Sequence, residues 1–189
     1  MTRPTWEKSA TGAAHDRVVA TTATLPRIET ARLVLRAPRL ADWASLEPIF
    51  TTERATHIGG PMTAEDAWLD FNQLVAGWVL RGHGALTITR RDDDDTPLGL
   101  VLLGHEFGDP QAELGWLLTT DAEGQGYATE AAAALRDWGF DLLGQAGFVS
   151  YIADGNATSV KVAARLGATR TGHHPQAQDV AIYGYGGAA

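Results

Sequence analysis

The chain of 189 residues is 44% hydrophobic and 20% charged, a composition typical of one globular domain rather than of a disordered chain. Its formal net charge of −8 argues against a general nucleic-acid binder, because neutralising phosphates requires clustered Lys and Arg. The sequence has no cysteine, which excludes disulfides, thiolate metal sites and a cysteine nucleophile. The six histidines lack the spacing of metal ligands, and the adjacent His173 and His174 are interpreted as a surface pair, so no metal site is expected.

The N-terminal part of the chain predicts a leader, a strand and a helix. Residues 1–25 are small, polar and aperiodic, which predicts a flexible leader before a single domain over residues 26–189. Apolar and polar residues alternate over residues 29–36, which predicts a strand that ends at Pro38. Asp42 stands at the N-cap position of a helix whose apolar residues recur at helical spacing. They are Trp43, Leu46, Ile49 and Phe50.

A second helix is predicted after the glycine–proline break at residues 59–61. Thr63 and Asp66 resemble the start of a capping box. The aromatic residues of this helix are more typical of core than of a pocket lining. They are Trp68, Phe71 and Trp78. Strands are then predicted over residues 85–89, 98–107 and 112–118, with the acidic run 92–95 as a solvated hairpin tip.

The C-terminal part predicts two helices and three strands. After a glycine-rich turn, apolar residues recur three or four positions apart along a long helix. They are Ala128, Ala132, Leu135, Trp138 and Leu142. A strand over 148–153, a helix over about 158–166 and strands near Arg170 and over 179–185 complete the chain. This order predicts one α/β mixed sheet with helices on its faces.

The sequence favours a cytoplasmic location. No apolar run approaches the roughly 20 residues that span a bilayer, so no membrane partner is expected. The N-terminus is interrupted by charged residues and does not resemble a secretory signal.

The turn at residues 123–129 (Glu-Gly-Gln-Gly-Tyr-Ala-Thr) follows a strand and opens a helix. Its glycines leave backbone amides unobstructed, and the positive end of the helix favours an anion such as a pyrophosphate. A Walker loop is excluded because no Gly-Lys-Ser/Thr follows, and the dinucleotide fingerprint fails because Thr129 replaces its third glycine. This segment alone leaves open a coenzyme A pyrophosphate loop and a purely structural turn.

Five segments together carry a family resemblance. They are Glu-Thr-Ala-Arg-Leu-Val-Leu-Arg at 29–36, Ala-Glu-Leu-Gly-Trp at 112–116, Gly-Gln-Gly-Tyr-Ala-Thr-Glu-Ala at 124–131, Asn-Ala-Thr-Ser at 156–159 and Ala-Arg-Leu-Gly-Ala at 164–168. Over about residues 27–185 the chain resembles the GNAT acetyltransferases, in particular their RimJ/RimL-like branch. The resemblance implies a central, mostly antiparallel twisted sheet, splayed between its two central strands and flanked by helices. It also implies an acetyl-CoA-dependent N-acetyltransferase in which a primary amine attacks the thioester directly.

The same resemblance implies which residues contact the coenzyme. Amides of the loop would hold the pyrophosphate, with Thr129 in the first helical turn; the loop residues are Gly124, Gln125, Gly126, Tyr127 and Ala128. The end of the preceding strand would hydrogen-bond the pantetheine arm through its backbone, at Trp116, Leu117, Leu118 and Thr119. Asn156 would contact the coenzyme arm, and Ser159 would lie near the thioester sulfur.

Two positions depart from the family pattern. Glu123 stands where the family has Arg or Gln, and a carboxylate beside a pyrophosphate is unfavourable unless it points to solvent. Ala163 stands where many relatives carry a tyrosine general acid, which makes Ser159 the better candidate for that role.

Glu113 is the first candidate for the general base, since some relatives carry a glutamate early on this strand. A base is needed because an alkylamine has a pKa of about 10 and is mostly protonated at neutral pH. His105, Glu106 and a base acting through water are alternatives, and His57, beside a glycine hinge, is placed to line the acceptor cleft.

Other functions stay open at this point. They are an acyltransferase that uses another acyl-CoA or acceptor, a non-catalytic module that senses acetyl-CoA, and a nucleotide-dependent enzyme. The sequence does not decide between a small-molecule amine and a peptide N-terminal amine, or between a monomer and a homodimer.

Overall fold

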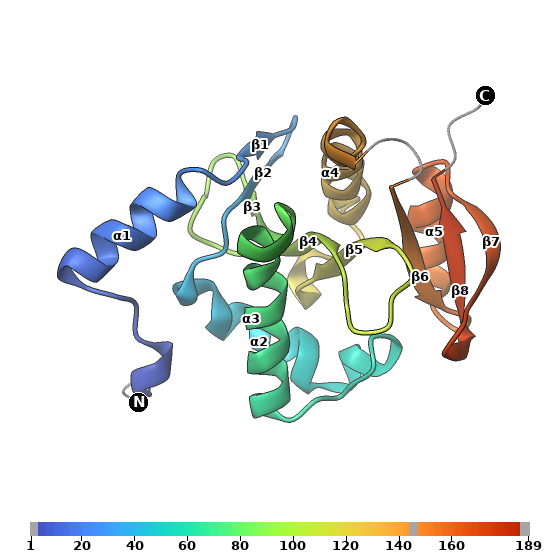
Figure 1. The fold of residues 1–189 in the computed structure, drawn as a ribbon, viewed down its shortest axis with the longest axis horizontal. Coiled ribbons are helices and arrows are strands. Elements are labelled where there is room, and N and C mark those ends of the chain that lie inside the picture. The colour runs from blue at the N-terminus through green and yellow to red at the C-terminus, as the bar shows by residue number, and fades with distance from the viewer. Residues whose placement is uncertain (1–3, 144–146, 186–189) are drawn as a thin grey trace.

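The computed structural model describes residues 4–143 and 147–185, which form one eight-stranded sheet with helices on both faces (Figure 1). The strands are β1 (Ile28–Glu29), β2 (Leu33–Arg36), β3 (Ala85–Arg90), β4 (Gly99–Gly104), β5 (Ala112–Leu118), β6 (Phe148–Ala153), β7 (Thr169–His174) and β8 (Ala177–Gly184). The helices are α1 (Gly12–Thr22), α2 (Trp43–Thr51), α3 (Ala64–Arg81), α4 (Tyr127–Leu143) and α5 (Ala157–Arg165). The predicted mixed α/β sheet and the predicted order of elements from β2 onward are confirmed.

The sheet has the strand order β1-β2-β3-β4-β5-β6-β8-β7, and its described neighbours are antiparallel except for β5 and β6. Parallel neighbours need a crossover connection, which α4 supplies. β5 and β6 share only the pairs Ala112–Phe148 and Glu113–Val149, after which their backbones no longer pair. The splay between two central strands, implied by the resemblance, is therefore confirmed.

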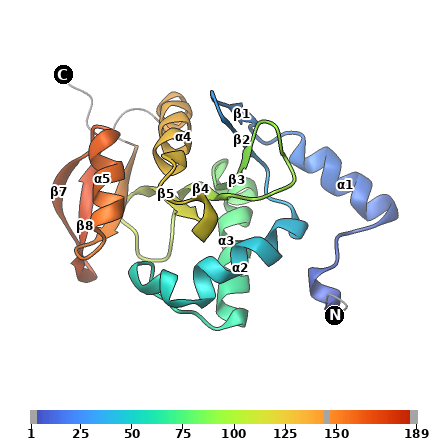
Figure 2. The same ribbon diagram turned by 180° about the vertical axis from the view of Figure 1, so that it is seen from behind.

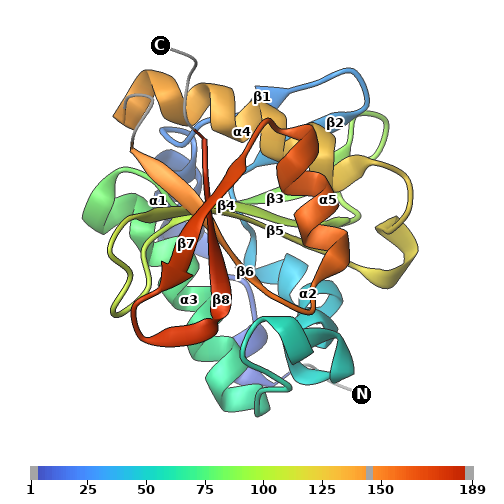
Figure 3. The ribbon, with the colours of Figure 1, turned by 90° about the vertical axis from the view of Figure 1, so that its right-hand side faces the viewer.

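The helices cover the sheet in two layers (Figure 3). α4 and α5 pack on one face, over an apolar cluster that includes the fully buried Leu103, Leu114 and Leu135. α2 and α3 pack on the other face, over a second cluster that includes Trp43 and Phe50. None of the described helices is long and apolar enough to cross a membrane.

The N-terminal segment lies at the end of the sheet opposite α5 (Figure 2). Within residues 1–25, interpreted from the sequence as a flexible leader, the structure has a 3₁₀ turn, Thr5–Glu7, and the helix α1, none of whose residues is buried. The sequence did not predict α1 because a helix without a buried face has no apolar period. The ring of Trp6 packs edge-on against Trp68 with centroids 4.8 Å apart.

Asp42 precedes α2 as predicted, but its side chain makes no capping hydrogen bond to that helix. Its carboxylate instead accepts two hydrogen bonds from the Arg36 guanidinium, at 2.8 and 2.9 Å, and one from the Thr87 hydroxyl at 2.8 Å. Charge-assisted, bidentate bonds to a buried guanidinium are stronger than a bond to a helix amide, so the predicted capping role is wrong. Thr63 does cap α3 as predicted, accepting from the Asp66 amide at 3.1 Å.

Element boundaries differ from the prediction in several places. The predicted strand 98–107 ends at Gly104, which leaves Glu106 in the loop before β5. Leu142, placed on the apolar face of α4, is exposed; it lies in the last turn of that helix. The acidic tip between β3 and β4 is less free than predicted, since the Asp94 carboxylate pairs with Arg27 and Arg39.

Candidate functional site

The glycine turn leads into α4, as the sequence predicts. Gly124 and Gly126 have φ angles of 72° and 80°, in the left-handed region that glycine adopts readily. The first amides of α4 have no partner within the helix, which leaves them available to an anion. The Thr129 hydroxyl in this first turn is buried without a hydrogen-bond partner. An exposed glycine turn beside an unsatisfied hydroxyl fits the diphosphate of a coenzyme.

Glu130 ties this loop to the N-terminal edge of the sheet. Its carboxylate accepts from the Thr30 hydroxyl at 2.6 Å, the Arg32 amide at 2.9 Å and the Arg32 Nε at 2.7 Å. Burial would raise the pKa of Glu130, but these hydrogen bonds hold it below its usual range. Arg32 also donates to the Gln125 carbonyl at 3.0 Å. The motif at residues 29–36 thus supports the motif at residues 124–131.

Glu123 is exposed, but its carboxylate is paired with an arginine. Its Oε1 lies 2.5 Å from Nη2 of Arg54, which comes from the 3₁₀ turn Glu53–His57. The same Nη2 donates to the Leu118 carbonyl at 2.9 Å. Arg54 was missed by the sequence reasoning, although it is the only Lys or Arg between residues 40 and 80. A counter-charge for Glu123 was the signal to look for, but the two residues are 69 positions apart.

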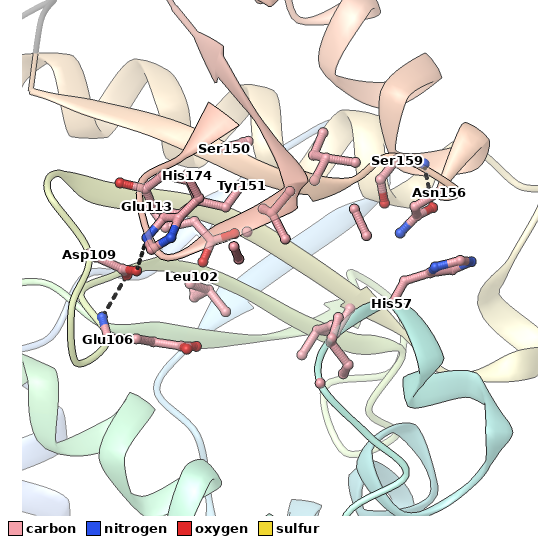
Figure 4. Close-up of a pocket in the computed structure, with 18 of the residues that line it drawn as sticks. His57, Leu102, Glu106, Asp109, Glu113, Ser150, Tyr151, Asn156, Ser159 and His174 are labelled. Carbon is pink, nitrogen blue, oxygen red and sulfur yellow. Dashed lines mark hydrogen bonds and ion pairs between the residues drawn. The ribbon is translucent and has the colours of Figure 1, made fainter. Parts of the chain in front are cut away.

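A cavity of about 480 Å³ occupies the space between the splayed strands (Figure 4). It brings together several residues predicted for the site: Glu113, Trp116, Leu117, Asn156 and Ser159. Glu106 and His57 also line it, whereas His105 does not. The aromatic side chains Trp68, Phe71 and Trp78 lie outside its lining, and the latter two are buried as predicted.

Of the four residues predicted at the end of β5, two line the cavity and two do not. Trp116 and Leu117 line the cavity, where the splay leaves their outer backbone edge without a strand partner. Leu118 and Thr119 lie beyond its lining. The Leu118 carbonyl accepts from Arg54, and the Thr119 amide donates to the Leu98 carbonyl at 2.9 Å.

Asn156 and Ser159 stand at the start of α5. The Asn156 Oδ1 accepts from the Ser159 amide at 3.0 Å and so caps the helix. This bond leaves the Asn156 amide nitrogen and the Ser159 hydroxyl facing the cavity (Figure 4). Ala163, where relatives carry a tyrosine, is fully buried.

Glu113 lies at the opposite end of the cavity from Ser159, in a crowded acidic environment (Figure 4). Burial, together with the nearby carboxylates of Glu106 and Asp109, raises the pKa of Glu113 to about 8. Burial, with Asp70 and Asp109, raises the pKa of Glu106 to about 7. A raised pKa of this kind is what a general base needs, so the environment of Glu113 is compatible with the predicted role.

The histidine pair does not lie together on the surface. His173 is exposed, whereas His174 is buried and lines the cavity, across an irregularity in the β7–β8 pairing. The prediction of a surface pair is thus wrong for His174. Asp70 and His174 are cavity residues that the sequence reasoning missed, since only the tertiary fold brings α3 and β7 to this space.

The comparisons with known proteins agree with this geometry. The chain matches the family described as acetyltransferase (GNAT) domain over residues 32–169. It is similar to the crystal structure of an acetyltransferase from Agrobacterium tumefaciens str. C58, with 36% identity and a TM-score of 0.81 over 87% of this chain and 96% of that one. It is also similar to YnaD, an uncharacterized N-acetyltransferase of Bacillus subtilis (strain 168), with 26% identity over 149 residues, 77% of this chain and 84% of that one.

A more distant structure shares the fold. RimL, a ribosomal L7/L12 alpha-N-protein acetyltransferase solved with coenzyme A, is 20% identical with a TM-score of 0.64 over 84% of this chain and 96% of its own. The family match covers most of the chain and includes the glycine turn, the cavity strands and the start of α5. The chain therefore belongs to the GNAT acetyltransferase family, and it is an acyltransferase whose acyl donor is the acetyl-CoA that this family uses.

Proposed function

We propose that this acetyltransferase moves the acetyl group of acetyl-CoA to a primary amine, by direct attack of the amine on the thioester. The observation that carries the proposal is Glu113, which lies in the cavity between the splayed strands with its pKa raised to about 8. A carboxylate that titrates near the working pH is well matched to taking a proton from an amine.

In this reaction the amine nitrogen bonds to the carbonyl carbon, and the carbon–sulfur bond breaks. The proton that the amine loses goes to Glu113, directly or through a water molecule. The departing thiolate takes a proton from Ser159 or from water, since Ala163 offers none. No side-chain nucleophile is required, and a backbone amide near Leu117 is the proposed donor to the oxyanion.

The donor would be held by the glycine turn and the exposed edge of β5. The turn offers the backbone amides before α4 and the Thr129 hydroxyl to the diphosphate, and Arg54 compensates the charge of Glu123 nearby. Trp116 and Leu117 offer unpaired backbone groups to the pantetheine arm, with Asn156 on the opposite wall.

The acceptor is a small-molecule amine or a peptide N-terminus. The cavity volume of about 480 Å³ falls in the range of small-molecule sites. RimL, which shares the fold, is by its name an α-N-protein acetyltransferase, so a protein N-terminus is the second candidate. A transferase for another acyl group and a non-catalytic acetyl-CoA sensor are the alternatives to test.

The first experiment is calorimetric titration of the protein with acetyl-CoA, with NAD and ATP in parallel, followed by release of free thiol with a panel of amines. Binding of acetyl-CoA alone, with thiol release that Glu113→Gln abolishes, is the expected result. Binding without turnover of any amine or peptide would favour a sensor. Faster turnover of a longer acyl-CoA would favour a different acyl donor.

A further inference from the structure

Four carboxylates from three segments of the fold line one cavity. Asp70 comes from α3, Glu106 and Asp109 from the loop between β4 and β5, and Glu113 from the start of β5. Glu106, Asp109 and Glu113 lie together at the end opposite Asn156 and Ser159 (Figure 4). None of the described residues that line the cavity is Lys or Arg. This end therefore has a negative potential that favours a cation.

Only Asp109 has a structural partner for each of its oxygens. Its Oδ2 accepts from the Glu106 amide at 2.8 Å, and its Oδ1 lies 3.5 Å from Nε2 of His174. Within residues 4–143 and 147–185, Asp70, Glu106 and Glu113 have no Lys, Arg or His nitrogen within salt-bridge distance. These three carboxylates face the cavity without a counter-charge.

The carboxylates also act on one another. Burial is the largest cause of the raised pKa values of Glu113 and Glu106, and repulsion from neighbouring carboxylates adds to it. The Asp70 carboxylate helps to raise the pKa of both Glu113 and Glu106, and burial raises the pKa of Asp70 itself. A bound cation would offset burial and repulsion at the same time, because both disfavour the charged form of the acid.

His174 is the histidine that lies beside these carboxylates in the cavity lining, and it contacts Asp109. His174 is only 9% exposed and lines the cavity. Its Nε2 makes no hydrogen bond. The other ring nitrogen, Nδ1, accepts from the Gln176 amide at 3.2 Å. The Nε2 of His174 lies 3.5 Å from Oδ1 of Asp109, so His174 is directed at Asp109 and gives Asp70, Glu106 and Glu113 no counter-charge.

Proton removal uses one carboxylate, and Asp109 is held in the loop, so Asp70 and Glu106 have no task in the proposed reaction. We propose that they bind a second cationic group of the acceptor, which makes the substrate a diamine or polyamine with its reactive nitrogen at Glu113. This inference rests on the proposed N-acetyltransferase function. Apolar side chains suited to a methylene spacer line the same cavity; they include Met62, Leu74 and Leu102.

The same charges determine what the cavity rejects. An acceptor with a carboxylate or phosphate at the position of the second cation would face Asp70 and Glu106 directly, and like charges brought together are unfavourable. Selectivity between acceptors of equal length thus depends on the sign of the distal group.

The test uses three acceptors with the same four-carbon chain: 1,4-diaminobutane, butylamine and 4-aminobutanoate, each with acetyl-CoA and the full chain. The expected kcat/KM is highest for the diamine, lower by about tenfold or more for butylamine, and lowest for the amino acid. A peptide with an N-terminal alanine and no charged side chain serves as a fourth acceptor.

Two variants assign the selectivity to the proposed residues. Asp70→Asn and Glu106→Gln should each reduce the ratio of kcat/KM for the diamine to that for butylamine by about tenfold. Glu65→Gln, on the exposed N-terminal turn of α3 and outside the cavity lining, is the matched control and should keep the ratio. Circular dichroism of each variant verifies that it is folded.

The possible outcomes distinguish failure of the diamine assignment from failure of the proposed N-acetyltransferase function. Turnover of butylamine or the neutral peptide equal to that of the diamine would overturn the diamine assignment and leave the N-acetyltransferase intact. If the ratio of kcat/KM for the diamine to that for butylamine is equal in Asp70→Asn, Glu106→Gln and the control, Asp70 and Glu106 do not bind the acceptor. Absence of turnover with all four acceptors would overturn both proposals.

Discussion

Arg54 Nη2 lies 2.5 Å from Glu123 Oε1, and this contact joins two segments that are 69 positions apart in the sequence. Arg54 belongs to the turn Glu53–His57, which reaches the cavity through His57, and Glu123 precedes the glycine turn of the donor loop. The negative charge that stands where relatives have Arg or Gln is thus balanced by a side chain from another segment. One ion pair thus connects the proposed donor loop to the segment that carries His57.

Arg54→Gln should weaken acetyl-CoA binding by about tenfold, corresponding to about 1.4 kcal/mol, because Glu123 would be left unpaired beside the diphosphate. The double variant Arg54→Gln with Glu123→Gln should recover most of the loss, since neither charge remains. Calorimetric titration of both proteins measures the difference. If the double variant binds no better than the single one, the effect of Arg54 does not pass through Glu123.

Glu113→Gln should lower kcat by about 10²- to 10⁴-fold, the usual contribution of a general base. The dissociation constant of acetyl-CoA should change little, because Glu113 lies at the far end of the cavity from the proposed coenzyme contacts at Asn156 and Ser159. Thiol release and calorimetry give the two quantities. A kcat within a few-fold of the parent would assign the base to water or to Glu106.

The pH dependence of kcat/KM should follow the ionisation of Glu113. Because its pKa is raised to about 8, the carboxylate is the minor form below that pH, and activity should rise as the pH increases through about 8. Glu106→Gln removes a negative neighbour, which lowers the pKa of Glu113 and moves the rise to lower pH. The same acceptor is used for both proteins, so that its own ionisation cancels. An identical rise in both would exclude Glu113 as the titrating group.

The charge of the donor loop can be tested at Gly124. Asn and Asp are similar in size and strained alike at a φ of 72°, and no atom lies within 4 Å of an added Cβ. Gly124→Asp should therefore lose about tenfold more acetyl-CoA affinity than Gly124→Asn, because only Asp brings a negative charge to the diphosphate. Equal losses would indicate that the turn has a structural role only.

Asp42→Asn should lower the free energy of unfolding by about 3–5 kcal/mol, since it removes the bidentate counter-charge of the buried Arg36 guanidinium and leaves only the Asp94 carboxylate, 3.6 Å from Nε. Both side chains of this pair are at most 4% exposed. Asp92→Asn is the control, because Asp92 is 76% exposed in its pair with Arg90 and such pairs contribute at most about 1 kcal/mol. Urea unfolding at neutral pH compares the two variants, and similar losses would contradict a special role for the buried pair.

Local patterns predicted much of the fold. The apolar residues of α2 recur with the helix period and are all buried, and Thr63 caps α3 as its position in the sequence indicates. The glycine turn before α4 was recognisable because left-handed backbone at Gly124 and Gly126 depends on residue type. Each of these features is determined by residues a few positions apart.

The rest depends on contacts between distant segments. Asp42 binds Arg36, six positions away, instead of the helix terminus because the fold also brings Thr87, 45 positions away, to its carboxylate. Asp70 occupies a helix position that a sequence pattern assigns to solvent, yet the packing of α3 brings it to the cavity. The backbone geometry of the glycine turn was therefore predictable from the sequence, and the group of carboxylates at the other end of the cavity was not.

Strands β1–β5 and strands β6–β8 are connected by only two backbone pairs, between β5 and β6. Most of the contact between these two parts of the sheet is therefore side-chain packing beneath α4. Phe148 lies there, with ring centroids 4.9 Å from Phe140 and 5.7 Å from Tyr185. A hydrogen-bonded ladder fixes the distance between strands, whereas apolar packing lets that distance change with side-chain volume. The width of the gap, and with it the size of acceptor admitted, can thus be altered by substitutions under α4 that leave every residue in contact with substrate unchanged.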